Sequence, residues 1–78
     1  MSEHRLQLQG LKCPLPVLHT RRALHRAAPG ERVIVECTDP LAAVDIPNLV
    51  RESGDVLERQ HRGGDGALVF AIRKRGGS

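Results

Sequence analysis

Apolar and polar residues alternate near the N-terminus, and the pattern then changes to a helical spacing. Over residues 4–9, Leu6 and Leu8 share one side and polar residues take the other, which predicts a half-buried strand. Gly10 ends this pattern. Residues 14–28 predict a helix that Pro29-Gly30 ends. Its apolar positions are Val17, Leu18, Leu24, Ala27 and Ala28, and its polar side carries Arg21, Arg22 and Arg26.

The middle of the chain predicts a second strand and a second helix. Residues 32–38 are rich in β-branched side chains and are bounded by Asp39-Pro40, so we expect a strand there, parallel to the first through a right-handed crossover. The next helix has two candidate starts: Asp39 capping a helix from Pro40, or Asp45 capping one from Ile46. Pro47 favours the second, so we expect a turn or a short helical piece near residues 41–44 and a helix over about 45–53 that Gly54 stops.

Two further strands complete the predicted fold. Residues 55–62 and 67–74 have strand character, and the glycine-rich segment 63–66 joins them as a hairpin. The predicted order is therefore βαβαββ. We expect a mixed four-stranded sheet with both helices on one face, an α/β two-layer sandwich. Residues 1–78 form a single domain with an ordered core of about residues 4–74, and residues 76–78 form a frayed tail.

Composition limits the possible functions. Phe70 is the only aromatic residue, so the core must consist mainly of aliphatic side chains. No stretch is long and apolar enough for a membrane span, and no signal peptide is evident, so we expect a cytoplasmic protein. The net charge is +3, and it is uneven. Residues 1–35 carry +4 and residues 36–78 carry −1, so the positive excess lies in the half that contains Cys13.

Cys13 is the strongest candidate for chemistry. It precedes the first predicted helix in Lys12-Cys13-Pro14-Leu15-Pro16. A helix N-terminus and a neighbouring lysine both favour thiolate over thiol. Pro14 suits the first helical position and Pro16 the same first turn, which predicts that the amides of Leu15 and Val17 face an anion at Cys13.

This segment resembles the Cys-Pro-x-Pro signature of the TusA/SirA-like family of small sulfur-carrier proteins. The later blocks are similar too, and the resemblance spans roughly residues 6–74. Those blocks are Pro29-Gly30-Glu31-Arg32-Val33, Thr38-Asp39-Pro40, Asp45-Ile46-Pro47 and Ser53-Gly54. The chain departs from the family at Gln7 and Gln9, where an acidic residue and then a basic or hydroxyl residue are common.

The resemblance implies the same fold and a function as a sulfur carrier, or sulfurtransferase. Cys13 would accept a sulfane sulfur as a transient persulfide, with no resident cofactor. The donor would be a cysteine desulfurase or a rhodanese-like protein, and the acceptor a second protein. Known family roles include tRNA thiolation, molybdenum-cofactor synthesis and sulfur oxidation. We expect a monomer whose partner-binding residues are Lys12, Pro14, Pro16, Arg21, Arg22 and Arg26.

Two alternatives come from other functional classes. The basic first half could contact RNA phosphates, but the chain has no set of aromatic residues for base stacking, so stable nucleic-acid binding is not expected. A regulatory interaction domain is the other alternative, and neither explains Cys13. Cys37 lies in a strand and is interpreted as a buried apolar residue, with a second sulfur-carrying role or a bridge to Cys13 as the alternatives. The scattered histidines predict no metal site.

Overall fold

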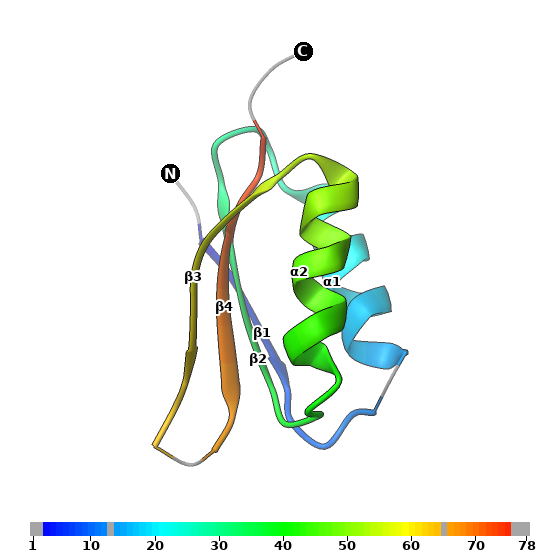
Figure 1. Ribbon diagram of the computed structural model, residues 1–78. Helices are drawn as coiled ribbons and strands as arrows, with labels where there is room; N and C mark the ends of the chain where they lie inside the picture. Colours follow the sequence, from blue (N-terminus) through cyan, green and yellow to red (C-terminus); the bar gives the residue numbers. More distant parts are fainter. Residues whose placement is uncertain (1–2, 13, 65, 76–78) are drawn as a thin grey trace.

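The computed structural model describes residues 3–12, 14–64 and 66–75. Its four strands form one sheet in the order β1-β2-β4-β3. They are β1 (Glu3–Leu8), β2 (Arg32–Cys37), β3 (Val56–Arg62) and β4 (Leu68–Arg73). β1 is parallel to β2, and the other two pairings are antiparallel. Helices α1 (Leu15–Arg26) and α2 (Ala42–Ser53) cover one face of the sheet (Figure 1), so the predicted mixed-sheet sandwich is confirmed.

The core lies between the two helices and the central strands. Phe70 on β4 is fully buried, as are Val33 and Val35 on β2 and Ile72 on β4. From the helices, Leu24 and Ile46 complete this layer with exposed fractions of 2% and 0%. Burial of aliphatic side chains is the main stabilising contribution in a domain this small, at about 1.5–3 kcal/mol for each fully buried side chain.

Helix α1 is shorter than predicted, and its buried face is partly different. It ends at Arg26 rather than Ala28, and Leu18 and Ala28 are exposed rather than in the core. Thr20 takes the core position instead, because it follows buried Pro16 by one turn and precedes buried Leu24 by another. Its hydroxyl donates to the Pro16 carbonyl at 2.7 Å, which satisfies the only buried polar side chain among the described residues.

Helix α2 begins earlier than the predicted start at Asp45. It runs from Ala42, so Pro47 lies inside the helix and Asp45 lies in the first turn rather than at a cap. Buried Ala42 and Ile46 are one turn apart and continue into Leu49 and Val50, a single stripe that faces the core. Burial along this stripe offsets the cost of an interior proline, about 3 kcal/mol.

Asp39 forms a turn before α2 rather than the helix cap that the sequence suggested, whereas Gly54 stops the helix as predicted. The Asp39 carboxylate accepts a hydrogen bond from the Leu41 amide at 3.0 Å, so it organises the turn that leads into the helix. Gly54 ends the helix in the left-handed conformation at φ 84°. The predicted hairpin also joins β3 to β4, with the Gly63 amide donating to the Ala67 carbonyl at 2.7 Å.

Candidate functional site

Cys13 lies outside the described residues, so the site is defined by the segments on either side of it. Before it, Gly10 has φ 85° and turns the chain out of β1. The Gly10 amide donates to the Thr38 hydroxyl at 2.9 Å, and the Leu11 amide donates to the Leu8 carbonyl at 3.2 Å. The approach to Cys13 is therefore fixed to β1 and to the segment that follows β2.

After Cys13, the start of α1 differs from the prediction by one residue. Pro14 occupies the N-cap position rather than the first helical one, and Pro16 is the second helical residue. The amide of Leu15 donates to the Lys12 carbonyl at 2.8 Å. The Leu15 amide therefore has a backbone partner, and the predicted role of the Leu15 and Val17 amides toward an anion at Cys13 concerns a residue outside the described ones. The Pro14 carbonyl accepts from the Leu18 amide at 3.1 Å and opens the helical ladder.

The start of α2 lies at the same end of the sheet as the start of α1, because each helix follows the carboxyl end of one of the two parallel strands (Figure 1). A hollow of about 330 Å³ lies between the two connections. It is lined by Gly10, Leu11, Lys12, Thr38, Asp39, Pro40 and Leu41. Lys12, the residue before Cys13 in the chain, is exposed and lines this hollow. It therefore brings a positive charge to a space that a partner group could enter.

Exposed apolar side chains cluster at this end of the molecule. Among the described residues, five large hydrophobic side chains are exposed, and four of them belong to the helix starts. We call these four the helix-start patch: Leu15 (42% exposed), Leu18 (49%), Leu41 (56%) and Val44 (61%). Single exposed apolar residues need no explanation, but a cluster of them is typical of a protein-binding surface.

The three arginines of α1 are all exposed, as expected, but they do not share one surface. Successive residues of a helix are about 100° apart, so Arg22 lies within about 40° of Leu18 and of Arg26. Arg21 lies about 100° from Arg22 and instead lines a groove against α2, where Glu52 is also found. Only Arg22 and Arg26 therefore extend the helix-start patch along α1.

Cys37 is buried as predicted, and its surroundings disfavour a second reactive thiol at this position. It has no exposed surface, and it pairs with Leu8 on one side and Leu68 on the other. Burial raises the pKa of its thiol, and the nearby Asp39 carboxylate raises it further. A buried thiol that resists ionisation is a poor nucleophile. The proposed bridge to Cys13 involves a residue outside the described ones.

The remaining candidate chemistry is structural. His4 lies 2.9 Å from the Glu31 carboxylate, which also accepts the Ala28 amide at 2.7 Å and so ties the end of α1 to β1. Within residues 3–12, 14–64 and 66–75, no three histidine, cysteine or acidic side chains come together to hold a metal ion. In the same ranges, neither helix is long and apolar enough to span a membrane.

The sequence analysis missed the helix-start patch, and a signal for it was present. Leu15 and Leu18 lie off the stripe through Pro16, Thr20 and Leu24, which a helical projection from the correct start would have shown. Leu41 and Val44 were predicted to lie in a turn or a short helical piece, so no exposed helix face was assigned to them. The sequence alone could also have predicted that Arg21 and Arg22 lie on different sides of the helix, because successive residues are about 100° apart.

Known proteins share both sequence and fold with this chain. A protein of Archaeoglobus fulgidus described as a "Putative sulfur carrier protein" is 38% identical over 64 residues, which cover 82% of this chain and 83% of the relative. A protein of Neisseria meningitidis serogroup A with the same description is 39% identical over 57 residues, covering 73% and 77%. The solved SirA-like protein of Desulfitobacterium hafniense has the same fold, with a TM-score of 0.82, 17% identity and coverage of 96% of this chain and 100% of its own. The family model "Sulfurtransferase TusA" matches residues 4–74, and the chain therefore belongs to the TusA sulfurtransferase family.

Proposed function

We propose that this protein is a sulfur carrier that holds a sulfane sulfur as a persulfide on Cys13. The observation that carries the proposal is the family match over residues 4–74, which includes the Lys12-Cys13-Pro14 segment between β1 and α1. The description of the relatives as sulfur carriers supports it. The burial of Cys37 leaves Cys13 as the thiol for this role, because the chain has two cysteines.

The proposed reaction is a sulfur exchange without net oxidation. The Cys13 thiolate attacks the outer sulfur of a donor persulfide, a new S–S bond forms, and the donor's S–S bond breaks to release its thiolate. The positive end of α1 and the Lys12 ammonium favour the anionic forms of Cys13. Delivery to an acceptor repeats the exchange in the other direction. The sulfur is cargo, so the reaction requires no resident cofactor.

The helix-start patch is the proposed docking surface for the donor and acceptor proteins. Its four apolar side chains belong to the helix starts at the end of the sheet from which the chain enters the Cys13 segment, so a partner that covers them would exclude water around the transferred sulfur. Arg22 and Arg26 continue the patch along α1 and would favour an acidic rim on the partner. Cysteine desulfurases and rhodanese-like proteins are the proposed donors, and the carrier would act in the cytoplasm as a monomer.

The direct test is intact mass after incubation with a cysteine desulfurase and cysteine. We expect the gain of one sulfur atom, reversed by reductant, in the wild type and in Cys37→Ala. Cys13→Ser should show no gain. A gain that persists in Cys13→Ser, or that disappears in Cys37→Ala while the fold is intact by circular dichroism, would contradict the assignment.

Charge reversal tests the docking surface. Arg22→Glu with Arg26→Glu should slow transfer from the loaded carrier at low salt, and the defect should shrink at high salt because charges at a rim act mainly on the association rate. The single variants Arg22→Glu and Arg21→Glu are the matched pair, since each changes the charge by two units on a different side of the same helix, and Arg22→Glu should show the larger defect. Equal defects in both variants would show that overall charge, rather than the patch, determines the rate.

A further inference from the structure

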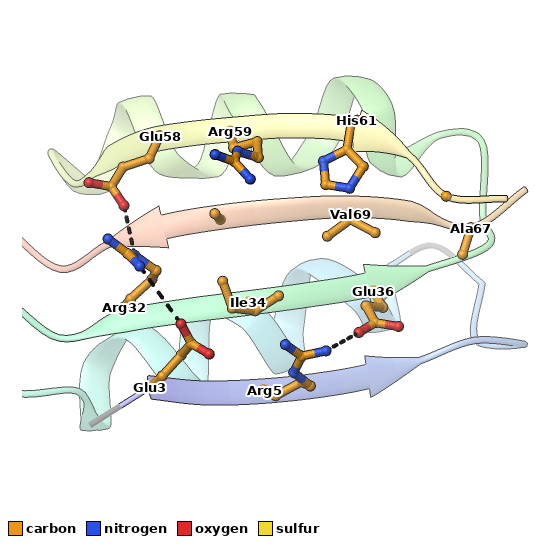
Figure 2. A pocket seen from close by; sticks show the side chains of 12 residues that line it. Glu3, Arg5, Arg32, Ile34, Glu36, Glu58, Arg59, His61, Ala67 and Val69 are labelled. Carbon is orange, nitrogen blue, oxygen red and sulfur yellow. Dashed lines mark hydrogen bonds and ion pairs between the residues drawn. The ribbon is translucent and has the colours of Figure 1, made fainter. Parts of the chain in front are cut away.

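The face of the sheet opposite the helices holds a wide hollow. It has a volume of about 660 Å³ and crosses all four strands (Figure 2). We call it the open-face hollow. Its floor is apolar and made of small or flat-lying side chains: Ile34, Ala67, Val69 and Ala71. Ile34 is only 9% exposed although no helix covers it, because long charged side chains surround it.

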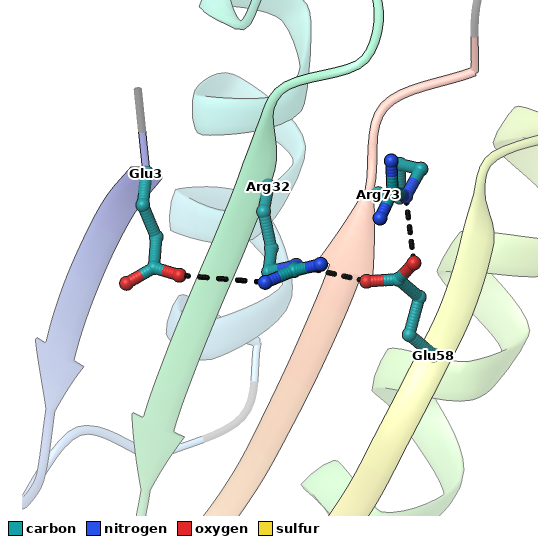
Figure 3. A network of polar contacts seen from close by, with 4 residues as sticks. All are labelled: Glu3, Arg32, Glu58 and Arg73. Atoms are coloured by element: carbon teal, nitrogen blue, oxygen red, sulfur yellow. Dashed lines mark hydrogen bonds and ion pairs between the residues drawn. The ribbon is translucent and has the colours of Figure 1, made fainter. Parts of the chain in front are cut away.

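The acidic residues of this face are already paired with arginines. Arg32 lies between two strands' carboxylates, at 3.8 Å from Glu3 and 2.9 Å from Glu58 (Figure 3). Arg73 contacts the other oxygen of Glu58 at 2.6 Å. Nearer the other end of the sheet, Glu36 accepts from Arg5 at 3.0 Å and from Gln9 at 3.2 Å. Glu3, Glu36 and Glu58 are thus matched by Arg5, Arg32 and Arg73.

Arg59 and His61 are the exceptions on this face. Both line the hollow from β3, and within the described part of the chain neither side chain forms a hydrogen bond or ion pair (Figure 2). An irregularity in the pairing between Leu57 and Arg59 causes this placement. It breaks the strand's alternation, so consecutive Glu58 and Arg59 both lie at the open face. Among the arginines that the structure describes in the lining, Arg5 and Arg32 contact carboxylates, and Arg59 is the one whose side chain has no carboxylate within ion-pair distance.

We propose that the open-face hollow binds an acidic, partly apolar segment of a partner protein, separately from the Cys13 end of the molecule. Carboxylates of the segment pair with Arg59 and receive an N–H from His61, and small apolar side chains cover Ile34, Val69 and Ala71. A nucleic-acid strand fits less well, since a continuous row of phosphates would lie against Glu3, Glu36 and Glu58. A peptide can place its negative charges only at the β3 side.

The experiment is a titration of the ¹⁵N-labelled protein followed by amide chemical shifts. The probe is an acetylated and amidated Glu-Ala-Glu-Val-Glu-Ala peptide, with its Gln-Ala-Gln-Val-Gln-Ala counterpart and heptauridylate RNA as comparisons. We expect shifts at Ile34, Val69 and Ala71 with the acidic peptide. Arg59→Glu should weaken binding by at least about tenfold, since it replaces an ion pair with a repulsion.

Arg62→Glu is the matched control. It makes the same charge change on the same strand, but Arg62 pairs with buried Leu68 and so lies on the other face of the sheet. The affinity of the Arg62→Glu variant for the acidic peptide should change less than about twofold, because this charge lies outside the proposed contact. Equal weakening by both variants, equal binding of the glutamine peptide, or no shifts on this face would overturn the proposal.

Binding of the RNA but not of the peptide, with the same dependence on Arg59, would also overturn it in favour of a nucleic-acid surface. The result is independent of sulfur transfer. Cys13→Ser should bind the acidic peptide like the wild type, and Arg59→Glu should still gain a sulfur atom on Cys13. Failure of one activity is therefore distinguishable from failure of the other.

Discussion

Native alkylation should distinguish the two cysteines by a large factor. Cys37 has no exposed surface and sits in a central strand, between Leu8 of β1 and Leu68 of β4. A reagent can reach it only after the sheet opens. The free energy of unfolding of a small domain is about 0.05 kcal/mol per residue at the lower end of its usual range, which gives about 4 kcal/mol for this length. The fraction of molecules in which the sheet is open is then about 10⁻³. Cys37 should react about 10³-fold more slowly in the native protein than in urea.

The assay is timed labelling with iodoacetamide at neutral pH, followed by trypsin and mass spectrometry. Cleavage after Lys12 and Arg32 places the two cysteines in different peptides. The Cys13 peptide should label at a rate close to that of the unfolded chain or faster. Labelling of Cys37 at more than about a tenth of its rate in urea would refute the reasoning, because it would require an opening cost near 1.4 kcal/mol.

The raised pKa of Cys37 also predicts how the free energy of unfolding depends on pH. In the unfolded chain its thiol ionises near the ordinary value of 9.0, whereas burial keeps it protonated in the folded protein. Its contribution to the free energy of unfolding is therefore complete below about pH 9 and is lost as pH rises through the folded pKa. Urea unfolding between pH 8 and 10.5 should show this decline in Cys13→Ser and a smaller one in Cys13→Ser with Cys37→Val.

Three further perturbations test the site and the fold. The hydrogen bond from Arg73, together with Arg32, lowers the pKa of Glu58 from its ordinary value of 4.5. The contribution of Glu58 to the free energy of unfolding is therefore present above that pH and is lost as pH falls through the folded pKa. Urea unfolding of Glu58→Gln should show a smaller loss of this free energy at acid pH than the wild type. Leu18→Asp should reduce sulfur transfer to a partner with little change in urea midpoint, whereas Val56→Asp, also half-exposed but outside the helix-start patch, should spare transfer. Thr20→Val should lower the free energy of unfolding by about 1 kcal/mol, since it removes the bond to the Pro16 carbonyl, and an unchanged urea midpoint would contradict that bond's role.

The periodic parts of the sequence predicted the order and type of the elements, although they left the start of α2 and part of the buried face of α1 open. The run over β2 could only be a central strand, and the order of elements then required a parallel β1 and a crossover through α1. The glycines at 10 and 54 ended elements as expected because both have positive φ. The Lys12-Cys13-Pro14 segment was visible as a motif, since its chemistry depends on adjacent residue types.

The errors arose where tertiary contacts outweighed local preference. Pro47 indicated a break, yet the stripe from Ala42 to Val50 faces the core and keeps α2 continuous through it. Thr20 was not among the predicted apolar positions of the first helix, but the Pro16 carbonyl satisfies its hydroxyl and allows it to be buried. The pairing irregularity before Arg59 has no local sequence signature, so the open-face hollow could not be anticipated.

The position of β4 in the sheet determines when the protein can first become stable during its synthesis. β4 is the last strand in chain order, yet it lies between β2 and β3. A nascent chain that ends before Leu68 has both helices and two parallel strands but lacks Phe70 and Ile72, so its apolar layer stays open to water. Folding must wait for the most distant pairing, and the docking of the β3–β4 hairpin onto β2 is the step that closes the domain. Pulsed labelling of Cys37, which faces Leu68 across that junction, would report the time of this step on a translating ribosome.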